Sequence, residues 1–187
     1  MRIQRVSKTC VKKVPHTSMN NKNDIKEFLI YYKEVEMQKQ KLIKPQVDIL
    51  SVEPQYIDKF WPLCDFMVTE ALHYSGGFAS AHHIKDLLKK DEAQLFLAFG
   101  NDEEELNQVF ALMVTRIAAL PNYSQLEAII ATGKKRHLWE DKLVSTVSKF
   151  AKINNCKKLS FWCRPGWARV SKKWGWKIKH IQMERNL

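Results

Sequence analysis

The sequence predicts an α/β protein, of the α+β kind, in which helices flank a mixed central sheet. Segments with the alternating pattern of strands follow one another along the chain with segments that show the helical period. The order from Val47 onward is strand, helix, helix, three strands, helix, strand, helix, strand, and it is typical of a sheet covered by helices. The 187 residues, of which 45% are apolar, suffice for one such domain and an extension.

Residues 1–46 are predicted to form a basic extension, and residues 47–187 to form the domain. Residues 1–22 are polar and show no period, which predicts an extended arm. A capping-box pattern at Asp24 begins a predicted helix over residues 24–42. We expect this arm and helix to contact partner proteins, because ordering such a segment against a partner exchanges chain entropy for contacts.

The first half of the domain is predicted to hold strands and two helices. Pro54 suits the first turn of a helix, and Ser80 suits the cap of a second one. The predicted strands are 47–52, 94–99 and 108–117, the helices are 53–72 and 80–90, and a hairpin loop covers 100–105.

The second half of the domain is predicted to begin with a central strand that runs into a basic loop. The predicted elements are a strand over 126–132, the loop over 133–139, a helix over 140–153, a strand over 158–163, a short helix over 164–174 and a strand over 176–183.

Charge is distributed unevenly along the chain, whose net charge is +11. Residues 134–187 hold 15 basic and 3 acidic side chains, whereas residues 47–133 hold 5 and 13. A basic face of this kind binds phosphates, nucleic acid or an acidic protein surface, and the alternative is a solvated lysine-rich face.

Several classes of protein are disfavoured by composition. The 4 cysteines form no CxxC pair and no cluster with histidine at metal spacing, so we expect no metal site and a reducing compartment. No apolar run approaches the roughly 18 residues that a membrane span needs.

The order of elements over residues 47–186 resembles that of the GNAT N-acetyltransferase superfamily, and its last third resembles the acyl-CoA-binding half. The motif Arg164-Pro165-Gly166-Trp167-Ala168-Arg169, followed by Lys172-Lys173-Trp174-Gly175-Trp176, resembles small GNAT-like proteins of tailed bacteriophages. The resemblance implies a GNAT-like domain with the arm and helix added to it.

In that family, the loop after the central strand and the start of the next helix hold the cofactor diphosphate. The resemblance places this site on Ala131 and Thr132 of the strand and on Lys134, Lys135, Arg136 and His137 of the loop. Leu138 and Glu140 occupy the two glycine positions of the family motif. A leucine blocks close approach and a glutamate repels phosphate, so the site looks degenerate. Either the basic side chains bind phosphates instead, or the loop binds no ligand.

Glu127 of the central strand is the candidate general base, because acyl transfer to an amine needs a group that takes the ammonium proton. The alternative is a structural ion pair with Arg116 of the neighbouring strand. Strand alternation predicts that Glu127, Ile129 and Ala131 share one face.

Ser171 falls at the position where the family carries a tyrosine that protonates the departing thiolate. A serine hydroxyl is a much weaker acid than a phenol, so the alternative is a residue on the helix surface. His73 and Tyr74, at the end of the first helix of the domain, are further candidates.

Three functions follow. The first is a GNAT-like phage protein with a degenerate acyl-CoA site and no cofactor, acting as a structural or interaction component of the virion at the portal, tail or internal core. Its arm would bind other virion proteins, and its location would be the host cytoplasm or the virion. The alternative is an acetyl-CoA-dependent N-acetyltransferase. A second alternative is a nucleic-acid-binding module, in which basic residues interleave with Trp167, Trp174 and Trp176.

Overall fold

The computed structural model describes residues 45–74, 78–163, 165–179 and 185. Contacts within the chain divide it into two units, Met1–Leu42 and Ile43–Leu187, and every feature described below belongs to the second. The predicted arm and the predicted helix over 24–42 lie outside the described residues.

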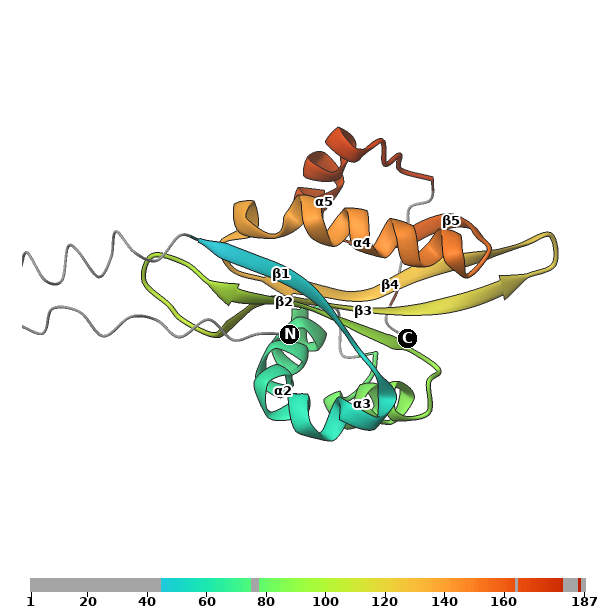
Figure 1. Ribbon diagram of the computed structural model, residues 1–187. Helices are drawn as coiled ribbons and strands as arrows, with labels where there is room; N and C mark the ends of the chain where they lie inside the picture. Colours follow the sequence, from blue (N-terminus) through green and yellow to red (C-terminus); the bar gives the residue numbers. More distant parts are fainter. Residues whose placement is uncertain (1–44, 75–77, 164, 180–184, 186–187) are drawn as a thin grey trace, which may run out of the picture. The chain divides into compact units, whose positions relative to one another are not determined.

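Five strands form one mixed sheet in the order β1-β2-β3-β4-β5 (Figure 1). The pairs β1–β2, β2–β3 and β3–β4 are antiparallel, whereas β5 runs parallel to β4. The strands are β1 (Gln46–Val52), β2 (Gln94–Asn101), β3 (Gln108–Leu120), β4 (Tyr123–Gly133) and β5 (Cys156–Phe161). This sheet, flanked by helices, confirms the predicted fold class.

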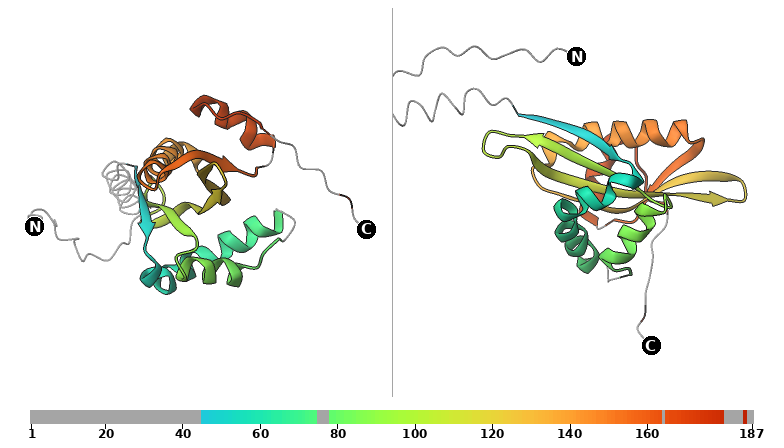
Figure 2. Two further views of the ribbon diagram at one scale, coloured as in Figure 1. Left: turned by 90° about the vertical axis from the view of Figure 1, so that its right-hand side faces the viewer. Right: turned by 60° about the horizontal axis from the view of Figure 1, so that its bottom comes forward.

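Helices cover both faces of the sheet. Figure 2 shows α2 and α3 on one side and α4 on the other. Ser80 caps α3 as expected, because its hydroxyl oxygen accepts a hydrogen bond from the His83 amide at 3.1 Å. The helices are η1 (Pro54–Tyr56), α2 (Ile57–Tyr74), α3 (Ala81–Lys89), η2 (Arg136–Leu138), α4 (Glu140–Ile153), α5 (Pro165–Val170) and η3 (Ser171–Trp174).

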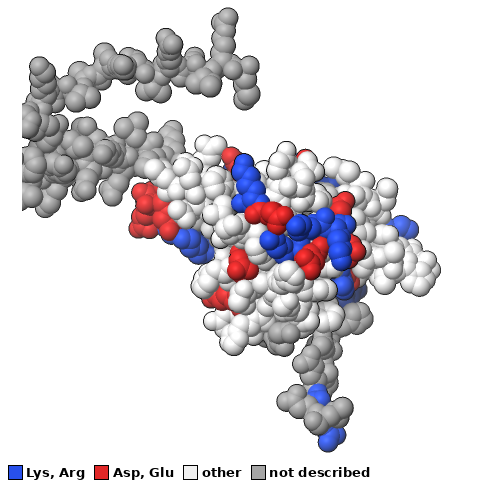
Figure 3. All heavy atoms as spheres, turned by 90° about the horizontal axis from the view of Figure 1, so that it is seen from below, with Lys and Arg blue, Asp and Glu red and all other residues white. Residues whose placement is uncertain are grey.

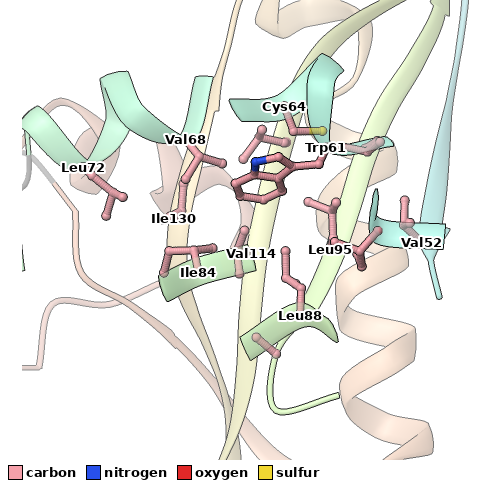
Figure 4. Packing of buried hydrophobic residues seen from close by; sticks show 14 residues of the cluster. Val52, Trp61, Cys64, Val68, Leu72, Ile84, Leu88, Leu95, Val114 and Ile130 are labelled. Atoms are coloured by element: carbon pink, nitrogen blue, oxygen red, sulfur yellow. The ribbon is translucent and has the colours of Figure 1, made fainter. Parts of the chain in front are cut away.

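Two apolar clusters hold the helices to the sheet, because neighbouring residues of a strand point to opposite faces. Leu95 and Leu97 of β2 belong to the cluster under α2 and α3, whereas Phe96 and Ala98 belong to the cluster under α4. Figure 4 shows the first cluster, in which α2 and α3 contribute Trp61, Cys64, Val68, Leu72, Ile84 and Leu88, and the sheet contributes Val52, Leu95, Val114 and Ile130.

A β-bulge interrupts β4 at Ile129. Thr115 of β3 is paired with Ala128, and the preceding Val114 is paired with Ile130, so Ile129 is an extra residue on β4. The bulge reverses the alternation of faces beyond it. Leu126 packs in the cluster under α4, but Ile130 packs under α2 and α3 although it lies an even number of residues farther on.

The bulge also changes the position of Ala131. Ala131 is paired with Met113, which packs against the α4 cluster, so Ala131 faces α4. Glu127 is paired with Arg116 on the opposite face. The prediction that Glu127 and Ala131 share a face is therefore wrong, because strict alternation does not hold across the bulge.

The predicted strand over 176–183 is also wrong where it is described. Residues 176–179 have no strand structure, and residues 180–183 lie outside the described residues. The Trp176 ring packs edge-on against Phe161, with 4.6 Å between ring centroids. Residues 176–179, which alternate between apolar and basic side chains, thus pack one aromatic ring against β5 but do not pair with it as a strand.

Candidate functional site

Strands β4 and β5 separate partway along the sheet. Their pairing begins at Ser124 and Cys156 and ends at Ala128 and Phe161, where β5 stops. β4 continues for five residues to Gly133, and among the described residues only β3 pairs with that stretch. One edge of β4 therefore presents backbone groups that an extended ligand can pair with.

A cleft of about 1420 Å³ opens at this separation. It extends along β4 from Glu127 to Lys134 and reaches α2 and α3 on one side and Trp167 of α5 on the other. The residues that line it beyond β4 are Phe66, Met67, Glu70, Ala71, Tyr74, Phe78, Ala79, His83, Ile84, Leu87, Val109, Arg116, Phe161, Trp162, Cys163 and Trp167. The cleft joins the candidate base to an aromatic rim.

Glu127 lies in the cleft with its carboxylate held in place. The Arg116 guanidinium donates through Nε to one carboxylate oxygen at 2.9 Å, and the Gln125 amide donates to the other at 2.7 Å. The Glu127 side chain is 19% exposed, so solvent and a ligand in the cleft can reach it. The predicted pair with Arg116 is present, and it leaves the carboxylate accessible to an amine.

The basic loop after β4 is tied to the acidic hairpin between β2 and β3. Lys134 Nζ lies 2.6 Å from the Glu105 carboxylate, and Lys135 Nζ pairs with Asp102 and lies 2.8 Å from Glu104. Figure 3 shows acidic and basic atoms together at the left end of the domain, where Figure 1 places this hairpin. The two lysines predicted to bind phosphates thus have carboxylate partners within the protein.

Asp102 anchors this hairpin. The hydrogen bond from the Lys135 ammonium, helped by the backbone amides of Glu104 and Glu105, lowers the pKa of Asp102 to about 2. Just before this loop, the end of β4 packs closely against β3, because a Cβ on Gly133 would clash with Ala111 of β3. The start of the loop is therefore fixed by charge pairing and close packing.

This geometry predicts a pH-dependent effect of Asp102→Asn. The folded-state pKa of Asp102 lies below its ordinary value of 3.8. The ionised carboxylate therefore stabilises the fold fully above about pH 4, and this stabilisation is lost as the pH falls toward about 2. We expect Asp102→Asn to lower the free energy of unfolding at pH 6 and to have little effect at pH 2, measured by urea denaturation. Glu103→Gln, an exposed neighbour in the hairpin, is the control. An equal loss at both pH values would contradict the prediction.

The start of α4 carries its own anion. Glu140 is buried, one carboxylate oxygen lies 2.7 Å from Arg136 Nε, and the other accepts a hydrogen bond from Lys173 of η3. A carboxylate in the first turn of a helix is stabilised by the helix dipole. Three of the four basic residues expected to contact a phosphate, together with Lys173, are thus engaged by carboxylates of this chain.

Leu138 does not line the cleft, so it does not block the approach of a ligand there. It packs against the apolar cluster under α4, beside the buried Trp139, whose indole donates to the Lys134 carbonyl at 2.7 Å. Of the two residues at the glycine positions, Glu140 therefore carries the main obstacle to a diphosphate, and that obstacle is electrostatic.

No protein-family model matches the sequence, and no curated protein matches it either. Solved structures do match. A probable acetyltransferase superposes with a TM-score of 0.55 at 12% identity, over 74% of this chain and 95% of that protein. An aminoglycoside acetyltransferase from an uncultured soil metagenomic sample gives 0.57 at 11% identity, over 76% and 99%. An acetyltransferase of Trypanosoma brucei gives 0.54 at 9% identity, over 76% and 100%.

The described domain has a GNAT-like fold. This result confirms the expected fold. At identities of 9–12%, the likeness to these structures concerns the fold alone. Ala131 and Thr132, two of the residues on which the resemblance placed the cofactor site, lie on the stretch of β4 that β5 does not pair with and line the cleft.

Ser171 lies on the other side of the sheet from the candidate base. It is buried, lines a small apolar cavity of about 50 Å³ under α4, and its hydroxyl donates to the Trp167 carbonyl at 2.7 Å. The expectation of a helix-surface residue is wrong, because η3 packs onto the sheet. Its proposed role as an acid stays a prediction, and the structure does not place it among the residues that line the large cleft.

The tryptophans of the basic region pack inward. Trp167 and Trp174 line the small cavity, Trp174 donates to Asp141 at 2.7 Å, and Trp176 contacts Phe161. These indoles are partly buried rather than presented as stacking platforms. The nucleic-acid prediction stays untested, and this packing removes its aromatic component.

Other candidates are placed as follows. Tyr74 and His83 line the cleft, whereas His73 does not. Among the described residues, no group of three or more His, Cys, Asp or Glu could hold a metal ion, and no helix is long and apolar enough to cross a membrane.

Sequence reasoning missed Glu70 and the exposed aromatics Phe66, Phe78 and Trp162 at the cleft. Phe66 could have been noticed as a large apolar residue on the polar side of its helix and Phe78 as one in a loop, but nothing in their spacing indicates a common cleft.

Proposed function

We propose that this protein is an N-acyltransferase, which transfers an acyl group from a thioester such as acetyl-CoA to an amine bound in the cleft. The observation that carries the proposal is the open edge of β4 beside Glu127. Acetyl-CoA supplies the activated acyl group, and the remaining functions fall to residues of this chain.

The donor end of the cleft suits an extended amide-containing arm. Residues 129–133 of β4 have a strand partner on one side only among the described residues. Backbone groups of Ala131 and Thr132, which line the cleft, can pair with the amides of a pantetheine arm as a strand pairs with a sheet edge.

Glu127 is the proton acceptor in this proposal. The amine nitrogen attacks the thioester carbonyl carbon, the carbon–sulfur bond breaks, and the thiol leaves with a proton. The excess proton of the original ammonium passes to Glu127, directly or through water. Arg116 and Gln125 hold the carboxylate in position but occupy each of its oxygens with only one donor.

The acceptor end of the cleft suits a cationic amine with an apolar body. Phe66 and Trp162 are 77% and 82% exposed, and Tyr74 and Phe78 also line the cleft. Glu70 lies among them, and among the described residues no partner of its carboxylate is found. Aromatic faces and a carboxylate together attract an ammonium group.

The direct test is to incubate the protein with acetyl-CoA and a panel of amines and to measure thiol release. The panel should contain an arylalkylamine, a polyamine, an aminoglycoside and a lysine-containing peptide. Acetylated product from any one of them supports the proposal. Absence of product from all four, together with no detectable binding of acetyl-CoA by calorimetry at millimolar concentration, would refute it.

Glu70→Gln is expected to raise the KM for a cationic acceptor about threefold to fivefold, because an exposed charge pair contributes up to about 1 kcal/mol. The kcat should stay the same, since Glu70 binds the amine and does not take its proton. Steady-state kinetics measure both. Asp65→Asn is the matched control, because Asp65 is exposed on the same helix but does not line the cleft. An unchanged KM for Glu70→Gln would remove Glu70 from the acceptor site.

The virion role remains a prediction from the sequence resemblance. Its arm lies outside the described residues, and the three neighbours named above are acetyltransferases.

A further inference from the structure

We propose that this protein recognises its acyl donor through the pantetheine arm, and that the nucleotide end of coenzyme A contributes little to binding. This inference rests on the proposed function and specifies its donor. It follows from the charges around the start of α4, where the resemblance places the donor diphosphate.

Glu140 already occupies the position of an anion at that helix start. Its side chain is 11% exposed, and both carboxylate oxygens face cations, Arg136 on one side and Lys173 on the other. A diphosphate bound there would lie close to this carboxylate and would compete with it for the same two cations. Repulsion between like charges is strongest where solvent is largely excluded, as it is around Glu140.

The remaining cations of the loop are also engaged. Lys134 pairs with Glu105, and Lys135 pairs with Asp102 and Glu104 of the β2–β3 hairpin. Those carboxylates balance the lysines. The basic loop is therefore close to neutral in its surroundings, although its sequence is strongly basic.

The pantetheine end of the cleft shows the opposite character. The β4 edge over residues 129–133 is open, and the cleft beside it is wide and lined by apolar side chains such as Phe161 and Trp167. An uncharged arm with two amides finds backbone partners and apolar contacts there, and it carries no charge for the carboxylates of this chain to repel. The structure thus favours the arm over the nucleotide.

The inference is tested by comparing three donors with one acceptor: acetyl-CoA, acetyl-4′-phosphopantetheine and acetyl-pantetheine. We expect kcat/KM values within about threefold of one another, because binding energy from a remote group appears in kcat/KM only when the protein contacts that group. A value about 100-fold lower for acetyl-pantetheine than for acetyl-CoA would overturn the inference. No transfer from any donor would instead count against the proposed function.

A binding measurement gives an independent readout. We expect adenosine 3′-phosphate 5′-diphosphate, which carries the nucleotide and the diphosphate of the donor, to show no binding to the wild type by calorimetry at millimolar concentration. Binding of this probe at micromolar concentration would overturn the inference without any activity assay.

Glu140→Gln tests whether this carboxylate is the excluding group. The variant frees Arg136 and Lys173, so we expect the affinity for coenzyme A to rise about tenfold while the affinity for pantetheine stays the same. Glu103→Gln, in the neighbouring hairpin, is the control and should change neither affinity. If Glu140→Gln folds, shown by a cooperative thermal transition, and its affinity for coenzyme A does not rise, the inference is wrong. If the variant does not fold, the comparison of donors on the wild type decides.

Discussion

Replacing Glu127 by glutamine is expected to lower kcat/KM for acyl transfer about 100-fold, the lower end of what a positioned general base contributes. Glutamine has the shape of glutamate but cannot take the ammonium proton. The assay is thiol release from acetyl-CoA with the best acceptor from the panel. Because the carboxylate also pairs with Arg116 at 2.9 Å, thermal unfolding must be measured on the same variant.

Two further variants separate a base from a structural partner. Glu92→Gln, an exposed residue that does not line the cleft, should keep the wild-type rate. Glu127→Asp retains the charge but withdraws it by one methylene, so its rate should fall less than that of Glu127→Gln if proton transfer through water is possible. Should Glu127→Gln keep more than about a third of the rate while losing stability, Glu127 is only the partner of Arg116.

Helix α4, which follows the basic loop, was predictable because its local signals agree. Acidic residues at Glu140 and Asp141 begin α4, the apolar residues Leu143, Val147 and Ala151 follow a helical stripe, and the observed bounds Glu140–Ile153 coincide with the predicted ones. The mixed sheet was predictable for a similar reason, since β2 and β3 have long apolar runs around a clear hairpin.

The cleft was not predictable from the same signals. A bulge at Ile129 adds one residue to β4 without any change in composition, and it moves Ala131 to the other face. The charges were misread for a related reason. A count of residues 134–187 gives a basic region, but the carboxylates that balance its loop come from the β2–β3 hairpin, about 30 residues earlier in the chain.

The two faces of the sheet make different contributions to function, and this distinction could be read from the sequence only in part. The α2–α3 face carries Glu127 and the acceptor end of the cleft, whereas the α4 face carries the charged start of α4. Alternation along β2 predicts two cores, but which core supports which end of the cleft depends on the bulge and on the parallel pairing of β5.

Phe96→Ala is expected to destabilise the fold by about 3–5 kcal/mol, because the change leaves a cavity in the cluster under α4. Phe96 is 1% exposed and its ring packs edge-on against Phe150 of α4, with 5.4 Å between centroids. Urea denaturation at neutral pH measures the loss. Phe66→Ala is the matched control, since Phe66 is 77% exposed and its removal should change the free energy of unfolding by less than about 0.5 kcal/mol. A loss below about 1 kcal/mol for Phe96→Ala would mean that α4 is not held by this core. The position of Glu140 at the start of α4 would then need another cause.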